Sequence, residues 1–154
     1  MRIIATSTLL LVLVCGCVSQ KQLNERWERE SGNYYLKYCQ AESPQAAIDA
    51  LNDYLHFVDN FELKKAIGPR YSFARALTEC RISMIYEQLG NKQASQAFMG
   101  RAVEDAEKDK YVDKTQDKQV VEADLRQTVE KINGWHTIEW QKAPSNAAPE
   151  PTAK

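Results

Sequence analysis

The chain has 154 residues, 44% of them hydrophobic and 27% charged, and a formal net charge of −1 at pH 7. This length and apolar content fit one domain with its own core and exclude a protein of several membrane spans. The weak net charge gives no support to binding of nucleic acid or to broad electrostatic attraction to a membrane.

Residues 1–16 differ in character from the rest of the chain. Arg2 gives a basic start, and residues 3–14 are apolar or small throughout. About a dozen such residues fall short of the ~20 needed to span a bilayer, so the segment predicts an export signal. An ordinary secretory signal or an uncleaved anchor would share these features.

The end of this segment resembles the lipobox of bacterial lipoprotein signal peptides. The lipobox has an aliphatic residue three positions before a cysteine and a small residue just before it, here Val14, Gly16 and Cys17. Cys15 departs from the small or aliphatic residue usual at its position. The resemblance implies cleavage after Gly16 and a lipid anchor, with palmitate, on Cys17. Val18 replaces the aspartate that commonly retains enteric lipoproteins at the inner membrane, which favours the outer membrane, facing the periplasm.

The sequence divides into a signal peptide (residues 1–16), a lipidated tether (17–22), a helical domain (23–142) and a tail (143–154). The tail holds three of the five prolines and no aromatic or long aliphatic side chain. Such a composition cannot bury enough surface to offset ordering, so we expect a disordered tail.

The first half of the domain shows two helical patterns. Residues 23–40 predict a helix with a possible break at residues 31–33, which are Ser-Gly-Asn. Ser43 is typical of an N-cap, and Pro44 suits the first helical position, so a second helix is expected to about Val58. Residues 59–67 are too short to classify, and a helical turn or extension is expected there.

A helical hairpin over residues 71–109, broken at Leu89-Gly90-Asn91, is the predicted centre of the fold. Apolar residues recur at helical spacing in both arms: Ala74, Leu77, Cys80, Met84, Ile85 and Leu89, then Ala94, Ala97, Phe98, Ala102, Val103 and Ala106. The alanine-rich second arm cannot complete a core, so further helices must pack on the hairpin. Glu104 and Lys108 are placed as a favourable i,i+4 surface pair.

A fifth helix is predicted over residues 117–132, with Asn133-Gly134 as its stop. The aromatic residues 135–140 fit either a strand-like arm or one more helical turn. No stretch has the valine- and isoleucine-rich alternation of a sheet. The predicted fold class is therefore all-α, built from antiparallel helical hairpins.

The central hairpin resembles a tetratricopeptide repeat. The family places small residues and a tyrosine in a fixed order, which here runs Ser83, Tyr86, Ser95, Met99 and Ala102, with a glycine at the turn. Serines replace Gly and Ala, Met replaces Phe, and the early Trp and final Pro are missing. The resemblance covers about residues 34–132 and implies stacked hairpins; a plain helical bundle would have the same periodicities.

Stacked repeats expose one helix of each pair on a concave groove, so the resemblance implies a partner groove that includes Arg75, Glu79 and Tyr86. A solvated face is the simpler reading of these charges, and Tyr86 could be structural. We expect a partner that is an envelope protein or peptide, with the membrane reached through the lipid anchor.

Candidate chemistry is sparse. His56 is expected on the surface and His136 in a structural role, and neither belongs to a ligand-spaced cluster, so no metal or other cofactor is predicted. Cys39 and Cys80 could form a disulfide in an exported protein or remain two buried thiols. No nucleophile–base pair is evident, so we predict that the protein is not an enzyme.

The preferred function is a membrane-anchored helical adaptor, in analogy with repeat-containing pilotins and assembly lipoproteins. An inhibitor or immunity lipoprotein that blocks an enzyme is the alternative, and an envelope hydrolase comes last. An apolar groove would favour the adaptor, a flat charged face the inhibitor, and a closed pocket with perturbed carboxylates the hydrolase.

Overall fold

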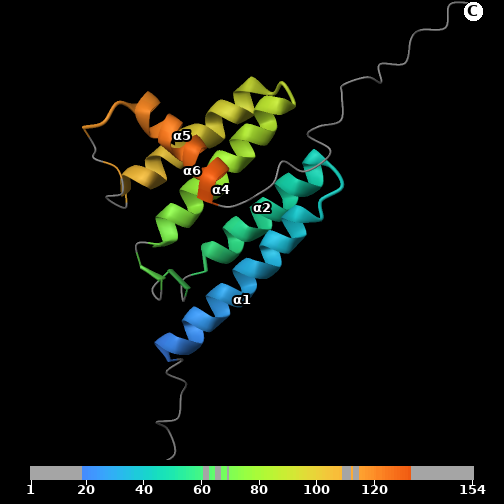
Figure 1. The fold of residues 1–154 in the computed structure, drawn as a ribbon, viewed down its shortest axis with the longest axis vertical. Helices are drawn as coiled ribbons and strands as arrows, with labels where there is room; N and C mark the ends of the chain where they lie inside the picture. Colours follow the sequence, from blue (N-terminus) through green and yellow to red (C-terminus); the bar gives the residue numbers. More distant parts are fainter. Residues whose placement is uncertain are drawn as a thin grey trace, which may run out of the picture.

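The computed structural model describes residues 19–60, 63–64, 67–68, 70–108, 112 and 115–132. These residues form α1 (Gln20–Cys39), α2 (Pro44–Val58), α4 (Arg70–Gln88), α5 (Lys92–Lys108) and α6 (Lys118–Ile132), with no strand in the described part of the chain. The all-α fold of helical hairpins is confirmed. Figure 1 shows α1 and α4 rising in the same direction on either side of α2, with α5 and α6 packed beyond α4.

Helix α1 begins earlier than predicted and has no break. Ser19 and Gln22 form a capping box, in which each side chain accepts from the other residue's backbone N–H. This cap starts the helix at Gln20, inside the segment expected to be a tether. Gly32 costs the helix about 1 kcal/mol relative to alanine, but aromatic side chains on both sides of it pack on α2 and keep the helix continuous.

Local capping signals place the next two boundaries as predicted. The Ser43 hydroxyl accepts from the Ala46 N–H, with Pro44 at the first helical position of α2. Between α4 and α5, Gly90 has φ +73°, and its N–H donates to the Glu87 carbonyl at 3.0 Å. The Asn91 N–H donates to the Tyr86 carbonyl at 2.9 Å. These two bonds complete a Schellman motif, in which the residue at position 90 must tolerate a positive φ.

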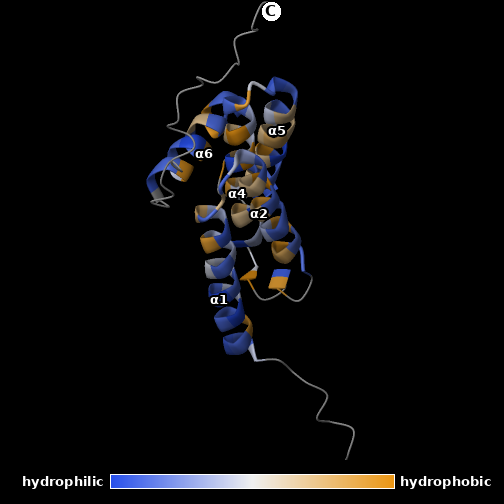
Figure 2. Ribbon diagram, turned by 90° about the vertical axis from the view of Figure 1, so that its right-hand side faces the viewer, coloured by the Kyte–Doolittle hydropathy of each residue, from blue (hydrophilic) through white to orange (hydrophobic). Residues whose placement is uncertain are grey.

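Helix α4 lies at the centre of the molecule and separates two core clusters. Ala76, Leu77 and Cys80 pack against α5 and α6, whereas Ile82 and Ile85 pack against the end of α1 and α2. The sequence predicts a single apolar stripe here, but residues 76–83 are buried on every side of the helix. Figure 2 shows the hydrophobic segments of α2, α4 and α5 meeting in the middle while α1 is largely hydrophilic.

Two polar residues that α4 buries, Thr78 and Ser83, form hydrogen bonds inside the protein. The Thr78 hydroxyl donates to the Ala74 carbonyl at 2.7 Å within its own helix. The Ser83 hydroxyl bonds to the Ser95 carbonyl at 2.8 Å and lies 3.1 Å from the Ser95 hydroxyl. Two serines, small and able to bond to each other, therefore allow α4 and α5 to approach closely.

Several sequence predictions fall outside the described residues. The signal segment, Cys17, the aromatic residues 135–140, His136 and the tail are among them. None of the helices in the described ranges is both long and apolar enough to cross a membrane.

Candidate functional site

A cavity of about 590 Å³ opens between α1 and α4, with α2 as its floor. It exists because α1 and α4 each pack mainly on α2 and meet each other only near the end of α1. This volume lies in the usual range for binding pockets in proteins. The lining is mainly apolar and aromatic and consists of Trp27, Ser31, Gly32, Tyr34, Tyr35, Leu51, Tyr54, Arg70, Phe73, Ala74, Leu77, Thr78 and Arg81.

An aromatic cluster holds the α1 wall of the cavity in place. The ring of Phe57 on α2 lies 5.6 Å from Trp27 and 5.3 Å from Tyr34, measured between centroids. Tyr54 lies 6.1 Å from Trp27 and 5.7 Å from Tyr34, and its hydroxyl donates to Ser31 at 3.4 Å. Such ring pairs each contribute about 0.5–1.5 kcal/mol beyond the area that they bury, so the wall is preorganised.

The charged residues of this lining are both arginines. Arg70 is exposed at the start of α4, whereas Arg81 is only 5% exposed. Burial disfavours the Arg81 cation and lowers its pKa to about 10, an effect that the nearby Tyr38 partly offsets. Arg81 is therefore still protonated at neutral pH, and the described lining carries two cations and no carboxylate.

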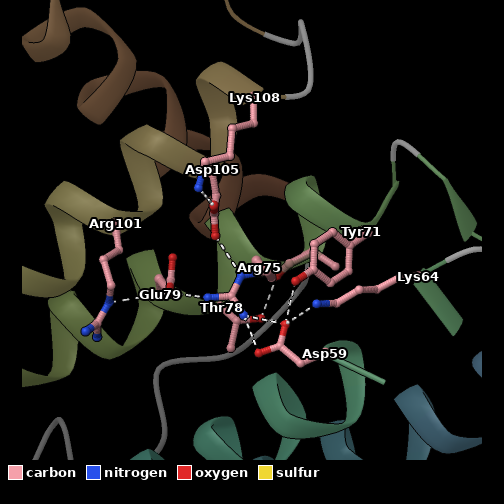
Figure 3. A network of polar contacts seen from close by, with 10 residues as sticks. Asp59, Lys64, Tyr71, Arg75, Thr78, Glu79, Arg101, Asp105 and Lys108 are labelled. Atoms are coloured by element: carbon pink, nitrogen blue, oxygen red, sulfur yellow. Dashed lines mark hydrogen bonds and ion pairs between the residues drawn. The ribbon is translucent and has the colours of Figure 1, made fainter. Parts of the chain in front are cut away.

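A second polar feature, on the other side of α4, is an ionic network centred on Arg75 (Figure 3). Its Nη1 lies 2.6 and 2.7 Å from the two carboxylate oxygens of Asp59, at the end of α2. Its Nε donates to Asp105 on α5 at 2.7 Å, and Nη2 donates to Glu79 at 3.1 Å. Burial opposes the charge of Arg75, but the bonds to Asp105 and Asp59 raise its pKa further above its ordinary value. One guanidinium thus joins three elements.

Glu79 is the most deeply buried carboxyl of this network, with 1% of its surface exposed. Its Oε1 also meets Arg101 at 3.4 Å, while its Oε2 has no hydrogen-bond partner among the described residues. Burial raises the pKa of Glu79 to about 7, against the opposing effect of Arg75 and with a further rise from Asp105. This carboxyl therefore holds a proton at a higher pH than an ordinary glutamate does, yet it does not line the cavity.

The structure places the three groove candidates away from the cavity. Arg75 and Glu79 belong to the internal network, and Tyr86 stacks on Phe98 of α5 at 5.6 Å. The reason is geometric: at 100° per residue, positions 75, 79 and 86 share one side of α4, and the cavity stripe from Arg70 to Arg81 lies on the opposite side. The sequence signal for the site is the group of aromatic residues in α1 and α2.

Two further predictions need correction. Cys39 and Cys80 are free thiols in the structure, so the possible disulfide is absent. Cys80 points into the core between α4, α5 and α6, where burial raises its pKa to about 11, whereas Cys39 is exposed. Lys108 pairs with Asp105 at 2.7 Å, rather than with Glu104 as predicted, because the Asp105 carboxylate is already fixed in the network.

His56 and possible metal-binding groups are the remaining candidates from the sequence. His56 is exposed on α2, as its position on the helix predicts. Within the described ranges, no group of three or more His, Cys, Asp or Glu side chains could hold a metal ion.

The fold is all-α, built from helical hairpins, with an aromatic-lined cavity between α1 and α4. No protein-family model, curated protein or solved structure matches this chain. The tetratricopeptide-repeat likeness of the hairpin therefore stays a prediction.

Proposed function

We propose that this protein is a non-enzymatic adaptor that binds a protein or peptide partner in the cavity between α1 and α4. The observation that carries the proposal is the preorganised aromatic wall beside a mainly apolar cavity of about 590 Å³. A cavity open to solvent and lined by Trp and Tyr suits an apolar side chain of a partner, since such rings are common anchors at interfaces.

The proposal also includes the place of action. Cys17, with Val14 and Gly16 before it, supports lipidation and attachment to the periplasmic face of the outer membrane. A helix that begins at Gln20 would keep the folded body close to the bilayer. Partners would then be other envelope proteins near the membrane surface.

Photo-crosslinking in intact envelopes tests the proposal. A benzoylphenylalanine at Gly32, which is exposed and lines the cavity, should capture one discrete partner. The same residue at Ala97, exposed on α5 and outside the cavity lining, should not capture it.

Three further variants complete the test. Ala74→Phe, which adds a ring to the cavity lining, should abolish capture from Gly32, and Ala97→Phe should leave it unchanged. Cys17→Ser should release the chain from the membrane fraction. Equal capture from Gly32 and Ala97 would reject the cavity as the binding site, and catalytic turnover by the purified protein would reject a non-enzymatic role.

A further inference from the structure

The cavity has a charge pattern along its length. Arg70 and Arg81 are eleven positions apart on α4, which corresponds to about 16 Å at 1.5 Å per residue. No Asp or Glu is found among the lining residues that the structure describes. The stripe between the two arginines is apolar or uncharged and consists of Phe73, Ala74, Leu77 and Thr78. A ligand that fills the cavity therefore meets apolar surface in the middle, the exposed Arg70 near one end and the charge of the buried Arg81 near the other.

The walls of the cavity repeat with the period of a helix. Lining residues recur on α4 at spacings of three and four, and Trp27, Ser31 and Tyr34 do so on α1. A third helix laid along these walls would present its own i, i+4 and i+7 side chains at the same repeat of about 5.4 Å per turn. An extended segment would place same-face side chains about 6.6–6.8 Å apart, which does not match.

We propose that the cavity binds an amphipathic helix of a partner protein, whose acidic side chains pair with the exposed Arg70 and are attracted by the charge of the buried Arg81 while its apolar stripe enters the cavity. The inference rests on the proposed function and specifies the partner's binding segment. The exposed guanidinium of Arg70 can form paired hydrogen bonds with a carboxylate. Arg81 is 5% exposed, with Nε and Nη2 buried, so it acts through its charge. The low local polarity strengthens its attraction for a glutamate of the partner and its repulsion of a lysine of the partner.

A synthetic probe tests the proposal on the full chain carrying Cys17→Ser, purified without lipid. The probe is a fluorescein-labelled, acetylated and amidated helical peptide with leucines at i, i+4 and i+7 and two glutamates eleven residues apart. Matched peptides carry glutamine or lysine in place of both glutamates. By fluorescence anisotropy, we expect the glutamate peptide to bind at least about 10-fold more tightly than the glutamine peptide, and the lysine peptide to bind weakest.

The variants connect that preference to the two arginines. Arg70→Gln, at an exposed position, should weaken binding of the glutamate peptide by about 3- to 10-fold. It should leave binding of the glutamine peptide unchanged, as in a double-mutant cycle. Arg81→Gln should have a larger effect, provided that circular dichroism shows a folded protein; Arg70→Gln keeps the test valid if it does not. Ala74→Phe should reduce binding of every peptide at least about 10-fold, and Ala97→Phe should reduce none.

Each contrary result has a defined meaning. Equal binding of the glutamate, glutamine and lysine peptides, or no binding of any, would overturn this inference. The proposed function would stand without the helix inference if the Gly32 crosslinker still captured a partner and Ala74→Phe abolished that capture. Binding of sodium dodecanoate that depends on Arg70, with no binding of the peptides, would replace the helix by a lipid anion and also overturn the inference.

Discussion

The buried carboxyl of Glu79 predicts an unusual dependence of stability on pH. Its folded-state pKa of about 7 lies above the ordinary value of 4.5. Between these values the folded state binds more protons than the unfolded state, so stability falls as pH rises from about 4.5 through about 7. At about 1.36 kcal/mol per pH unit, the gap gives about 3 kcal/mol as the ceiling of this contribution.

Glu79→Gln isolates the effect because glutamine keeps the size of the side chain and cannot ionise. We expect the free energy of unfolding of wild type minus that of the variant to fall by about 1–3 kcal/mol between pH 4.5 and pH 8. Urea unfolding of the Cys17→Ser chain at several pH values measures this difference. Glu87→Gln is the matched control, because Glu87 pairs with Arg126 on the surface with 58% of its side chain exposed.

The difference curve of this control should be flat over the same range. A flat curve for Glu79→Gln, or one that rises with pH, would show that the folded protein does not hold a proton on Glu79 and would refute the reasoning. Asp59 does not interfere: burial opposes its charge, but bonds from Tyr71 and Arg75 lower its pKa. Its contribution is therefore lost only below its ordinary pKa of 3.8, outside the measured window.

Three further predictions concern stability and reactivity. Ser83→Ala removes a buried hydroxyl that bonds across the α4–α5 turn, so urea unfolding should show a loss of about 1–2 kcal/mol; an unchanged midpoint would contradict that bond. Gly90→Ala should destabilise the protein by about 1 kcal/mol, because Gly90 has φ +73°. Gly32→Ala has open space around its new Cβ and should stabilise α1 by up to about 1 kcal/mol. If both substitutions changed the free energy of unfolding in the same direction, the conformation given to one of the two glycines would be wrong. Iodoacetamide should label Cys39 in the native protein and Cys80 only after unfolding, as peptide mapping would show; early labelling of Cys80 would contradict its burial.

The candidate site was accessible to sequence reasoning only in part. Trp27 and Tyr34 are seven positions apart, and Tyr54 and Phe57 are three apart, which identifies one face of α1 and one of α2. The sequence does not say whether such a face is closed by another helix. The structure shows that α4 leaves this face partly open, because it packs on α2 and turns Ala76 and Cys80 toward α5 and α6.

The sequence by itself determined where the second helix starts and where the central hairpin turns. Ser43 with Pro44, and Gly90 with Asn91, act within about one helical turn, so they give the same signal in any fold. The all-α class follows from periodicity for the same reason.

Only the tertiary structure decided that Arg75 and Glu79 face inward. Their positions on α4 resemble an ordinary solvated face. Arg75 becomes internal because Asp59 and Asp105, 16 and 30 positions away in the chain, converge on it. The free energy of a buried charge depends on such partners, and the arrangement of the helices, rather than any local pattern, brings them together.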